Sequence, residues 1–240
     1  MKKVIEAIAG AKERLSRPAE AETESPVSVS ETVFDESHHI EEMPRFSPEP
    51  SPGQKSAVKY RMANLQIDLR NVDLHLVSVD QISLWLAQVV EVESPVFWLE
   101  GTRRVAAAAG VARVGSRIQE AFERALHTGS RWGRFKVKDG FLWKTDMETT
   151  TVRDRSDLPQ SCKKIDYVTS EEIQSAILQV AQDSFGATPI EIAHGACRLL
   201  GFGRVTDDVR VVNDQNRDAL VAAGVLEQRG ESLIATSDGG

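Results

Sequence analysis

The sequence has little of what would build a secreted or membrane-spanning protein. Its 240 residues include two cysteines, Cys162 and Cys197, which are too few for a disulfide framework and indicate reduced thiols. No apolar run approaches the roughly 20 residues that a membrane-spanning helix needs. The charged residues Glu6, Lys12 and Glu13 interrupt the segment in which a signal peptide would be apolar. These absences predict a cytoplasmic protein.

Residue patterns that carry common enzymatic chemistry are also missing. The phosphate-binding loop Gly-x4-Gly-Lys-Ser/Thr does not occur, which argues against ATP hydrolysis. His194 and Cys197 stand three residues apart, but no second pair completes the four ligands of a zinc site. Asp139 and Lys144 lack the second carboxylate that a metal-dependent nuclease would need. The sequence therefore predicts no catalytic site, no cofactor and no metal.

What the sequence has instead is a long internal repeat. Residues 110–115 (GVARVG) return as residues 201–206 (GFGRVT), displaced by 91 residues. A displacement of this length indicates a duplicated domain, since solenoid repeats have periods of about 20–50 residues. Each copy follows a predicted helix and precedes another helix and a hairpin. This order predicts two tandem winged-helix-like units, in an α+β fold in which helix dominates.

The first predicted unit spans residues 58–145 and opens with a strand and a helix. Residues 65–69 alternate between apolar and polar side chains, which is the pattern of a half-buried strand. Asp80 is placed to cap a helix that runs to about Val90 and has an apolar inward face. The unit is expected to bury its core along this helix.

Two more helices and a hairpin complete the first predicted unit. One helix covers about residues 99–109 and ends before a glycine, and the next begins at Ser116 with Gln119 as the partner in a capping box. Asp139-Gly140 is a strong signal for a hairpin turn. The predicted inward face of the third helix comprises Ile118, Ala121, Phe122, Ala125 and Leu126.

The second predicted unit spans residues 166–237 and repeats this order. Residues 169–172 (TSEE) and 188–191 (TPIE) each match a capping box at the start of a helix. Thr206 is placed to cap a third helix over about residues 207–222, and a hairpin follows it. The predicted inward face of this helix comprises Val209, Val212, Ala219 and Leu220.

Two further segments flank and join the units. Residues 1–57 begin with an amphipathic pattern at residues 3–16 and are otherwise rich in Pro, Ser and Glu, which predicts a short helix and a disordered acidic linker. Residues 146–165 form the predicted connector. Within it, residues 152–156 (VRDRS) fit two interpretations. Either the arginines clamp the two units together through hydrogen bonds, or the segment is a solvated linker.

The formal net charge of −7 hides a marked asymmetry along the chain. Residues 101–145 carry 10 Lys and Arg against 3 Asp and Glu, a net charge of +7. Residues 1–50 carry 6 against 11, a net charge of −5, and residues 166–240 carry 5 against 12, a net charge of −7. The first unit is therefore a basic island between acidic flanks, and such an island is typical of nucleic-acid binding.

The basic island supplies candidate contacts to DNA. Helix-turn-helix modules place one helix in the major groove and contact phosphates from flanking elements. The predicted nucleic-acid-binding residues are Arg103, Arg104, Arg113, Ser116, Arg117, Arg124, Arg134, Lys136 and Lys138. The alternative is an ordinary solvated face on which Glu120 pairs with Arg124 four residues later. The +7 charge in an otherwise acidic chain favours DNA.

The second unit is acidic where the first is basic. Arg204 keeps the repeated arginine, but Asp207 and Asp208 open the third helix. Acidic side chains suit the positive end of a helix dipole, and they would repel a phosphate backbone. We therefore expect this unit to dock a protein, with Asp207, Asp208 and Arg210 as the candidate contacts.

Five separated motifs occur in an order that resembles a known family. They are residues 91–96 (EVESPV), 113–118 (RVGSRI), 141–143 (FLW), 152–156 (VRDRS) and 199–204 (LLGFGR). From about Tyr60 to Ile234 the chain resembles a bacterial helicase-associated family catalogued as domain of unknown function 3320. In that family the segment usually closes a large protein that contains a superfamily-1 helicase and a restriction-endonuclease-like domain, and several such proteins are associated with phage defence. Phe97 departs from the family pattern, in which a histidine follows the Pro-Val pair.

The resemblance implies a context for the chain more than a mechanism. The expected function is a non-catalytic DNA-binding accessory module of a bacterial helicase and nuclease system, and DNA and such a helicase or nuclease are its expected partners. The best candidates for phosphate contacts are Arg113, Arg117, Arg124, Lys136 and Lys138. Two alternatives stay open. One is a protein-interaction module that docks a helicase or nuclease without touching nucleic acid, and the other is a truncated gene remnant.

Overall fold

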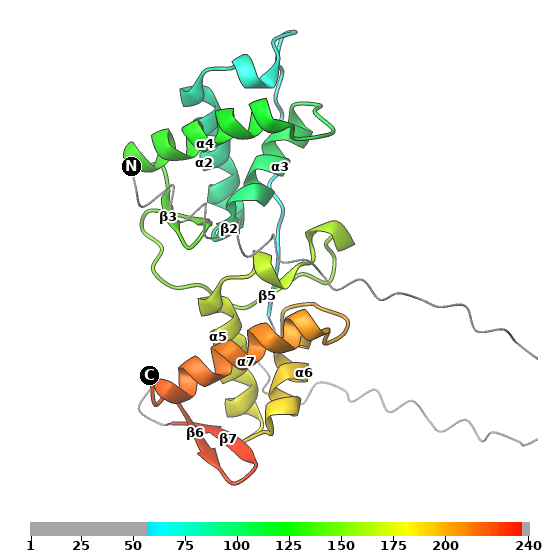
Figure 1. The fold of residues 1–240 in the computed structure, drawn as a ribbon, viewed down its shortest axis with the longest axis vertical. Coiled ribbons are helices and arrows are strands. Elements are labelled where there is room, and N and C mark those ends of the chain that lie inside the picture. Colours follow the sequence, from blue (N-terminus) through cyan, green and yellow to red (C-terminus); the bar gives the residue numbers. More distant parts are fainter. Residues whose placement is uncertain (1–56, 237–240) are drawn as a thin grey trace, which may run out of the picture.

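The computed structural model describes residues 57–236, which form two helical units joined by a connector (Figure 1). The α-helices α2 to α7 dominate this part of the chain, and short strands complete an α+β fold, as the sequence predicts. The predicted helix at residues 3–16 and the predicted linker that follows it lie outside the described residues. None of the helices in residues 57–236 has the length and apolar character that crossing a bilayer requires.

The first unit combines three helices with a three-stranded sheet. Its elements are α2 (Val79–Glu93), β2 (Val96–Phe97), α3 (Trp98–Ala108), α4 (Ser116–Arg131), β3 (Lys136–Lys138) and β4 (Phe141–Trp143). The strand order is β2-β4-β3, and both pairs are antiparallel. The short strand between the first two helices therefore closes the sheet against the hairpin at the end of the unit.

The hairpin of the first unit turns at Asp139 and Gly140, as predicted. Their φ angles are 51° and 82°, and a two-residue type I′ turn requires positive φ at both positions. Glycine reaches this region without strain because it has no Cβ, and aspartate tolerates it better than most residues do. The turn thus sets the register of β3 and β4.

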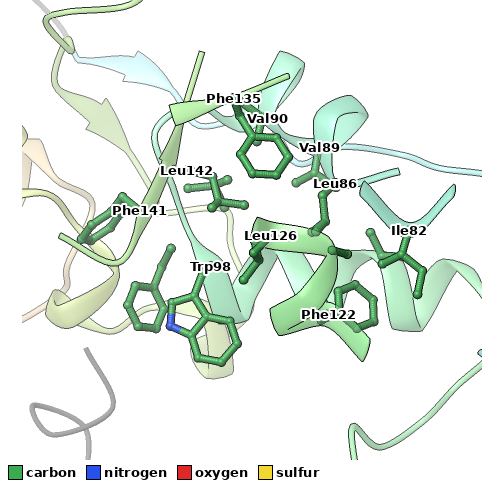
Figure 2. Packing of buried hydrophobic residues seen from close by; sticks show 14 of the residues in the cluster. Ile82, Leu86, Val89, Val90, Trp98, Phe122, Leu126, Phe135, Phe141 and Leu142 are labelled. Atoms are coloured by element: carbon green, nitrogen blue, oxygen red, sulfur yellow. The ribbon is translucent and has the colours of Figure 1, made fainter. Parts of the chain in front are cut away.

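The core of the first unit gathers the apolar sides of its helices and of β4. Figure 2 shows Trp98 and Leu142 in this core, together with the side chains of α2 and α4 that face it. The predicted inward face of α4 is confirmed by its buried residues Ala121, Phe122, Ala125 and Leu126. Ile118, which was predicted with them, is half-buried and packs at the edge of the core.

The second unit has the same order of elements. They are α5 (Ser170–Asp183), α6 (Pro189–Leu199), α7 (Asp207–Ala222), β6 (Leu226–Arg229) and β7 (Ser232–Ala235). The hairpin β6–β7 is antiparallel. Where the first unit has β2, the second has a single bridge between Ala187 and Leu233.

The two units share one register along their length. α4 and α7 begin at Ser116 and Asp207 and both contain 16 residues, so that they are displaced by 91 residues at each end. The same displacement relates α3 to α6. It also relates the pairing of Val96 with Leu142 to the bridge between Ala187 and Leu233. Each residue of one unit therefore has a positional counterpart in the other.

Three local predictions for the first unit are wrong. Residues 65–69 are extended, and their apolar side chains pack on the core as the alternation implies, but they pair with no strand of the described chain. Ser78, and not Asp80, caps α2 with its side chain. α4 begins at Ser116 as predicted, but its N-cap is Gly115, and a glycine has no side chain with which to form a capping box.

The predicted helix starts of the second unit are confirmed. Thr169, Thr188 and Thr206 each accept a hydrogen bond from the backbone N–H three residues later. The capping box is complete only at Thr188, where the Glu191 carboxylate accepts from the Thr188 backbone N–H. Glu172 was predicted as the equivalent partner of Thr169, but its carboxylate binds two arginines instead.

The inward face of α7 is partly polar. Val209 and Leu220 are buried as predicted, whereas Ala219 is exposed and its prediction is wrong. Asn213 and Asn216 are buried instead, and each donates its side-chain amide to the main-chain carbonyl four residues earlier. These hydrogen bonds satisfy the two side-chain nitrogens, and the Asn216 Oδ1 accepts from Gln174, whereas the Asn213 Oδ1 has no partner within residues 57–236.

The connector also pairs with the segment that enters the first unit. β1 (Val58–Lys59) and β5 (Arg153–Asp154) lie side by side between the units and form a parallel pair. Two 3-10 helices, Gln160–Cys162 and Ile165–Tyr167, lead from β5 to the second unit, and a third, Leu74–Leu76, precedes α2. The chain therefore returns to its own entry point before it starts the second unit.

Candidate nucleic-acid interface

Three arginines form a stripe along the exposed side of α4. Arg117, Arg124 and Arg131 follow one another at seven residues, which corresponds to almost two helical turns and about 10.5 Å. All three are exposed, and within residues 57–236 no ion pair holds their guanidinium groups. The alternative ion pair between Glu120 and Arg124 is not formed in this part of the chain. We call these three residues the arginine stripe.

Ser116, the first residue of α4, and Arg113 in the loop before it extend this surface at the start of the helix. Both predicted residues are exposed. Because the N-cap is Gly115, no side chain accepts a hydrogen bond from the N–H groups of the first turn. Free N–H groups at a helix start bind phosphate groups well. The start of α4 thus adds hydrogen-bond donors to a cationic surface.

Trp132 and Arg134 lie at the other end of the stripe. Trp132 is the C-cap of α4 and is 60% exposed. The guanidinium of Arg134 lies 4.7 Å from the centroid of the indole ring. Arg134 also forms a 2.6 Å ion pair with Asp80 and a hydrogen bond with Ser83, both on α2. The predicted DNA contact Arg134 is therefore engaged inside the first unit.

The predicted contacts on α3 are engaged as well. Arg103 pairs with Glu100 and donates a 3.1 Å hydrogen bond to the hydroxyl of Tyr167. Arg104 is mostly buried and forms 3.2 Å ion pairs with both Glu93 and Glu100. These two arginines bond α3 to neighbouring segments. They lie on α3, whereas the arginine stripe lies on α4.

The lysines of the hairpin differ in availability. Lys138 pairs with Glu171 at the start of α5, so it joins the hairpin of the first unit to the second unit. This hydrogen bond raises the pKa of Lys138. Lys136 is exposed, and its ammonium lies 3.8 Å from the exposed carboxylate of Glu148. Only a weak surface interaction therefore competes with a ligand for Lys136.

The counterparts of the arginine stripe in the second unit are Asp208, Gln215 and Ala222. None of these three residues is a cation. Asp207 and Arg210, which were predicted to bind a partner with Asp208, pair with each other on the surface of α7. At the three stripe positions α7 thus has one acid and two neutral residues where α4 has three cations.

The arginines of the connector clamp the two units together, which decides between the two interpretations of residues 152–156. Arg153 donates to the main-chain carbonyls of residues 93–95 in the first unit and forms a 2.7 Å ion pair with Glu172 in the second. Arg155 binds both oxygens of the same carboxylate, at 2.7 and 2.8 Å. Glu172 therefore receives two arginines in an environment without solvent.

A second buried acid continues these contacts into the first unit. Glu93 is 1% exposed and accepts hydrogen bonds from the hydroxyl of Tyr60 at 2.8 Å and from the N–H of Ala63 at 2.9 Å. The Tyr60 ring in turn lies 4.9 and 5.1 Å from the two connector guanidiniums. We call this set the buried ion cluster, and its charged members are Glu93, Glu100, Arg104, Arg153, Arg155 and Glu172.

The sequence predictions missed the acidic half of the buried ion cluster. In the sequence, Glu93 and Glu172 cannot be told apart from the solvated glutamates that are common on helix surfaces. The signal that could have found them is the pair of arginines in residues 152–156, because arginines beside a buried segment need buried acids as partners. Nothing in the local sequence, however, says which glutamates those are.

The environment fixes the ionisation of two groups in this cluster. Burial by itself would raise the pKa of Glu172, but Arg155 and Arg153 outweigh burial and hold that pKa below its ordinary value. Burial raises the pKa of the Tyr60 phenol, and the neighbouring Glu93 carboxylate raises it further. Glu172 is thus ionised and Tyr60 protonated near neutral pH, which suits a structural clamp.

A cleft of about 190 Å³ separates the hairpin of the first unit from the helices of the second. Phe97, Phe141 and Trp143 line it on one side, and Gln215 and Asn216 of α7 line it on the other. Gln215 is the counterpart of Arg124 in the arginine stripe. The counterpart of Arg124 on α7 therefore lines a cleft against the first unit, whereas Arg124 itself is exposed on α4.

Metal-binding groups do not gather in the described chain. Within residues 57–236 no three His, Cys, Asp or Glu side chains are arranged to hold a metal ion. His194 is exposed, and Cys197 is buried as a free thiol. Burial raises the pKa of the Cys197 thiol.

Comparison with known proteins gives one family match. The family described as "Protein of unknown function (DUF3320)" matches residues 72–120, which include α2, α3 and the first turn of α4. The match supports the family resemblance of the sequence motifs, and it covers about a fifth of the chain. No curated protein and no solved structure matches the chain.

Proposed function

We propose that this chain is a non-catalytic accessory module that binds DNA through its first unit, mainly by contacts to phosphates. The observation that carries the proposal is the arginine stripe, whose three cations are exposed on α4 and form no ion pair within residues 57–236. Arginines bind phosphate oxygens through charge-assisted, often bidentate, hydrogen bonds. A helix with cations at its start, middle and end can hold a phosphate backbone along its length.

The order of elements supports a winged-helix assignment for both units. In each unit a helix, a short strand or a single bridge, two helices and a hairpin follow one another in the same register. In helix-turn-helix modules the equivalent of α4 enters the major groove, which is about 12 Å wide, and flanking elements contact the backbone. In this arrangement Ser116 begins α4, Arg113 lies in the loop before it, and Lys136 lies on β3 of the hairpin that follows.

The family resemblance bears on the proteins with which the module would work. The resemblance of the separated motifs implies that the chain works with a superfamily-1 helicase and a restriction-endonuclease-like domain in the bacterial cytoplasm, in defence against phage. The match over residues 72–120 supports only the family label of that resemblance. Such a system needs a means of holding DNA near its catalytic parts. The first unit would supply sequence-independent affinity, since phosphate contacts carry no base information.

The test is a fluorescence-anisotropy titration of labelled duplex and single-stranded DNA across salt concentrations. We expect salt-dependent binding by the wild type. The variant Arg117/Arg124/Arg131→Gln should bind more weakly, and the slope of log K against log salt should fall by about 2–3, because each phosphate contact contributes about 0.9 to that slope.

The second unit provides a matched control. The variant Arg204/Arg210/Arg229→Gln removes the same charge from exposed positions of the second unit, and it should bind DNA like the wild type. If both variants lose affinity equally, the effect belongs to net charge and the stripe is not the binding site. If the folded wild type does not bind DNA at low salt, the proposal is wrong.

One observation favours protein docking by the second unit as an additional role. Phe185 is 93% exposed and has a φ of 52°, and Ile190 is 72% exposed on the other side of the same turn. Large apolar side chains that stand in solvent mark interaction surfaces. A folded protein that fails to bind DNA but binds a helicase or nuclease through these residues would establish this role as the main one.

A further inference from the structure

Trp132 is a large aromatic side chain that the fold leaves in solvent where the arginine stripe ends. It is 60% exposed, whereas Trp98 and Trp143 are buried in the core. Its counterpart in the second unit is Ala223, so the fold of a unit does not need an aromatic ring at this position. Packing within the unit therefore does not explain why a tryptophan stands at this position.

Arg134 stacks on the indole ring of Trp132. The guanidinium of Arg134 lies 4.7 Å from its centroid, and Asp80 and Ser83 hold that guanidinium in place. A cation stacked on an aromatic ring orients the ring, because the ring face carries negative charge density. The exposure of the residue leaves the remaining ring surface open to a planar ligand.

We infer that Trp132 is a stacking platform for an unpaired nucleobase, so that the first unit binds single-stranded DNA at this end of α4. Proteins that bind single strands combine a cationic track for the backbone with aromatic rings on which bases stack. Arg131 precedes Trp132 directly in the chain and belongs to the arginine stripe, so the ring follows the last cation of the stripe. The inference rests on the proposed function and names the form of DNA that it takes.

The experiment compares Trp132→Ala with the wild type on two probes, labelled oligothymidylate and a blunt hairpin duplex. Stacking on one ring predicts that Trp132→Ala weakens binding to oligothymidylate by about 5- to 100-fold. Binding to the duplex should change by less than about twofold, because paired bases do not reach the ring. Trp132→Phe should keep most of the affinity for oligothymidylate.

Phe185→Ala is the matched control for this experiment. It removes an aromatic ring that is 93% exposed on the second unit, and it should leave binding to both probes unchanged. Oligothymidylate should also quench the tryptophan fluorescence of the wild type, and this quenching should be lost in Trp132→Phe. Quenching that persists without Trp132 would contradict the stacking contact.

The possible outcomes separate this inference from the proposed function. If Trp132→Ala binds oligothymidylate as tightly as the wild type, or loses both probes equally, the stacking platform is wrong. In either case the arginine-stripe variant still tests DNA binding by itself. If that variant keeps full affinity for both probes, the DNA-binding proposal fails, and the inference about Trp132 fails with it.

Discussion

At the scale of single residues, Glu172 is a fully buried acid that pairs with two arginines. Its side chain has no exposure, and its carboxylate is balanced by Arg153 and Arg155 at 2.7 Å. Two buried guanidiniums would be left without their acid if the carboxylate were removed. Breaking a buried ion pair in this way costs about 3–5 kcal/mol, far more than the loss of a surface pair.

The variant Glu172→Gln should therefore lose about 3–5 kcal/mol of unfolding free energy, measured by chemical denaturation. Glu171→Gln is the control, because it removes the neighbouring acid from a partly exposed pair with Lys138 and should cost less than about 1 kcal/mol. Equal effects of the two variants would show that the buried ion cluster does not stabilise the fold.

The same residue gives a pH dependence. The pKa of Glu172 is lower in the folded chain than its ordinary value of 4.5, so its stabilising contribution is present above that pH and is lost as the pH falls through the lower folded pKa. The difference in stability between the wild type and Glu172→Gln should therefore shrink as the pH falls below about 4.5. A difference that stays constant with pH would contradict this assignment.

At the scale of elements, the packing of α4 on its hairpin depends on one glycine. Gly129 lies on the buried side of α4, and a Cβ at this position would overlap the ring of Phe135. The counterparts in the second unit are Leu220 and Leu226, which are both buried. One unit thus fills this space with a glycine and a large ring, and the other fills it with two leucines.

Gly129→Ala should destabilise the first unit by about 1–3 kcal/mol, because overpacking a buried site costs more than the roughly 1 kcal/mol that alanine adds to a helix. The double variant Gly129→Ala/Phe135→Leu should recover most of this loss, since the smaller side chain makes room for the methyl group. Thermal unfolding measures both. A single variant that is as stable as the wild type would show that Phe135 can move aside.

The elements of this fold were more predictable than its electrostatics, for physical reasons. Helix starts with capping threonines depend on neighbours in sequence, so Thr169, Thr188 and Thr206 could be recognised directly. The extended residues 65–69 have the alternation of a strand, but a strand also needs a partner elsewhere in the chain. That partner is a tertiary property, and the sequence pattern does not contain it.

In the candidate site, too, some features could be predicted from local sequence and others depend on tertiary contacts. The exposure of Arg117 and Arg124 follows from helical spacing, because the opposite side of α4 is apolar. Arg134 looked equally available, but its acid, Asp80, lies 54 residues earlier in the chain. The exposure of Trp132 also does not follow from the sequence, since a position at the end of a helix fits either packing or solvent.

At the scale of the whole molecule, the connector is bonded to both units. Arg153 alone reaches three carbonyls of the first unit and the buried acid of the second. We expect the wild type to unfold in a single calorimetric transition. Arg153→Ala should separate it into two, because each unit has its own core.

Arg229→Ala is the control for this prediction. It removes an exposed arginine that pairs with Glu227 on the outer hairpin, and it should leave the single transition intact. A single transition in Arg153→Ala would show that the remaining contacts between the units, such as the pair of Lys138 with Glu171, are enough to couple them.

The parallel pairing of β1 with β5 also decides how the molecule carries mechanical load. Tension applied at residue 57 and at residue 236 enters β1 from its start and leaves β5 from its end, so the two strands are pulled along their length in opposite directions. Hydrogen bonds in such a shear geometry, with the clamp of Arg153 beside them, resist together instead of opening one by one. The first unit forms a loop between these strands and is bypassed by the force, so its arginine stripe would keep its shape while the ends of the chain are pulled.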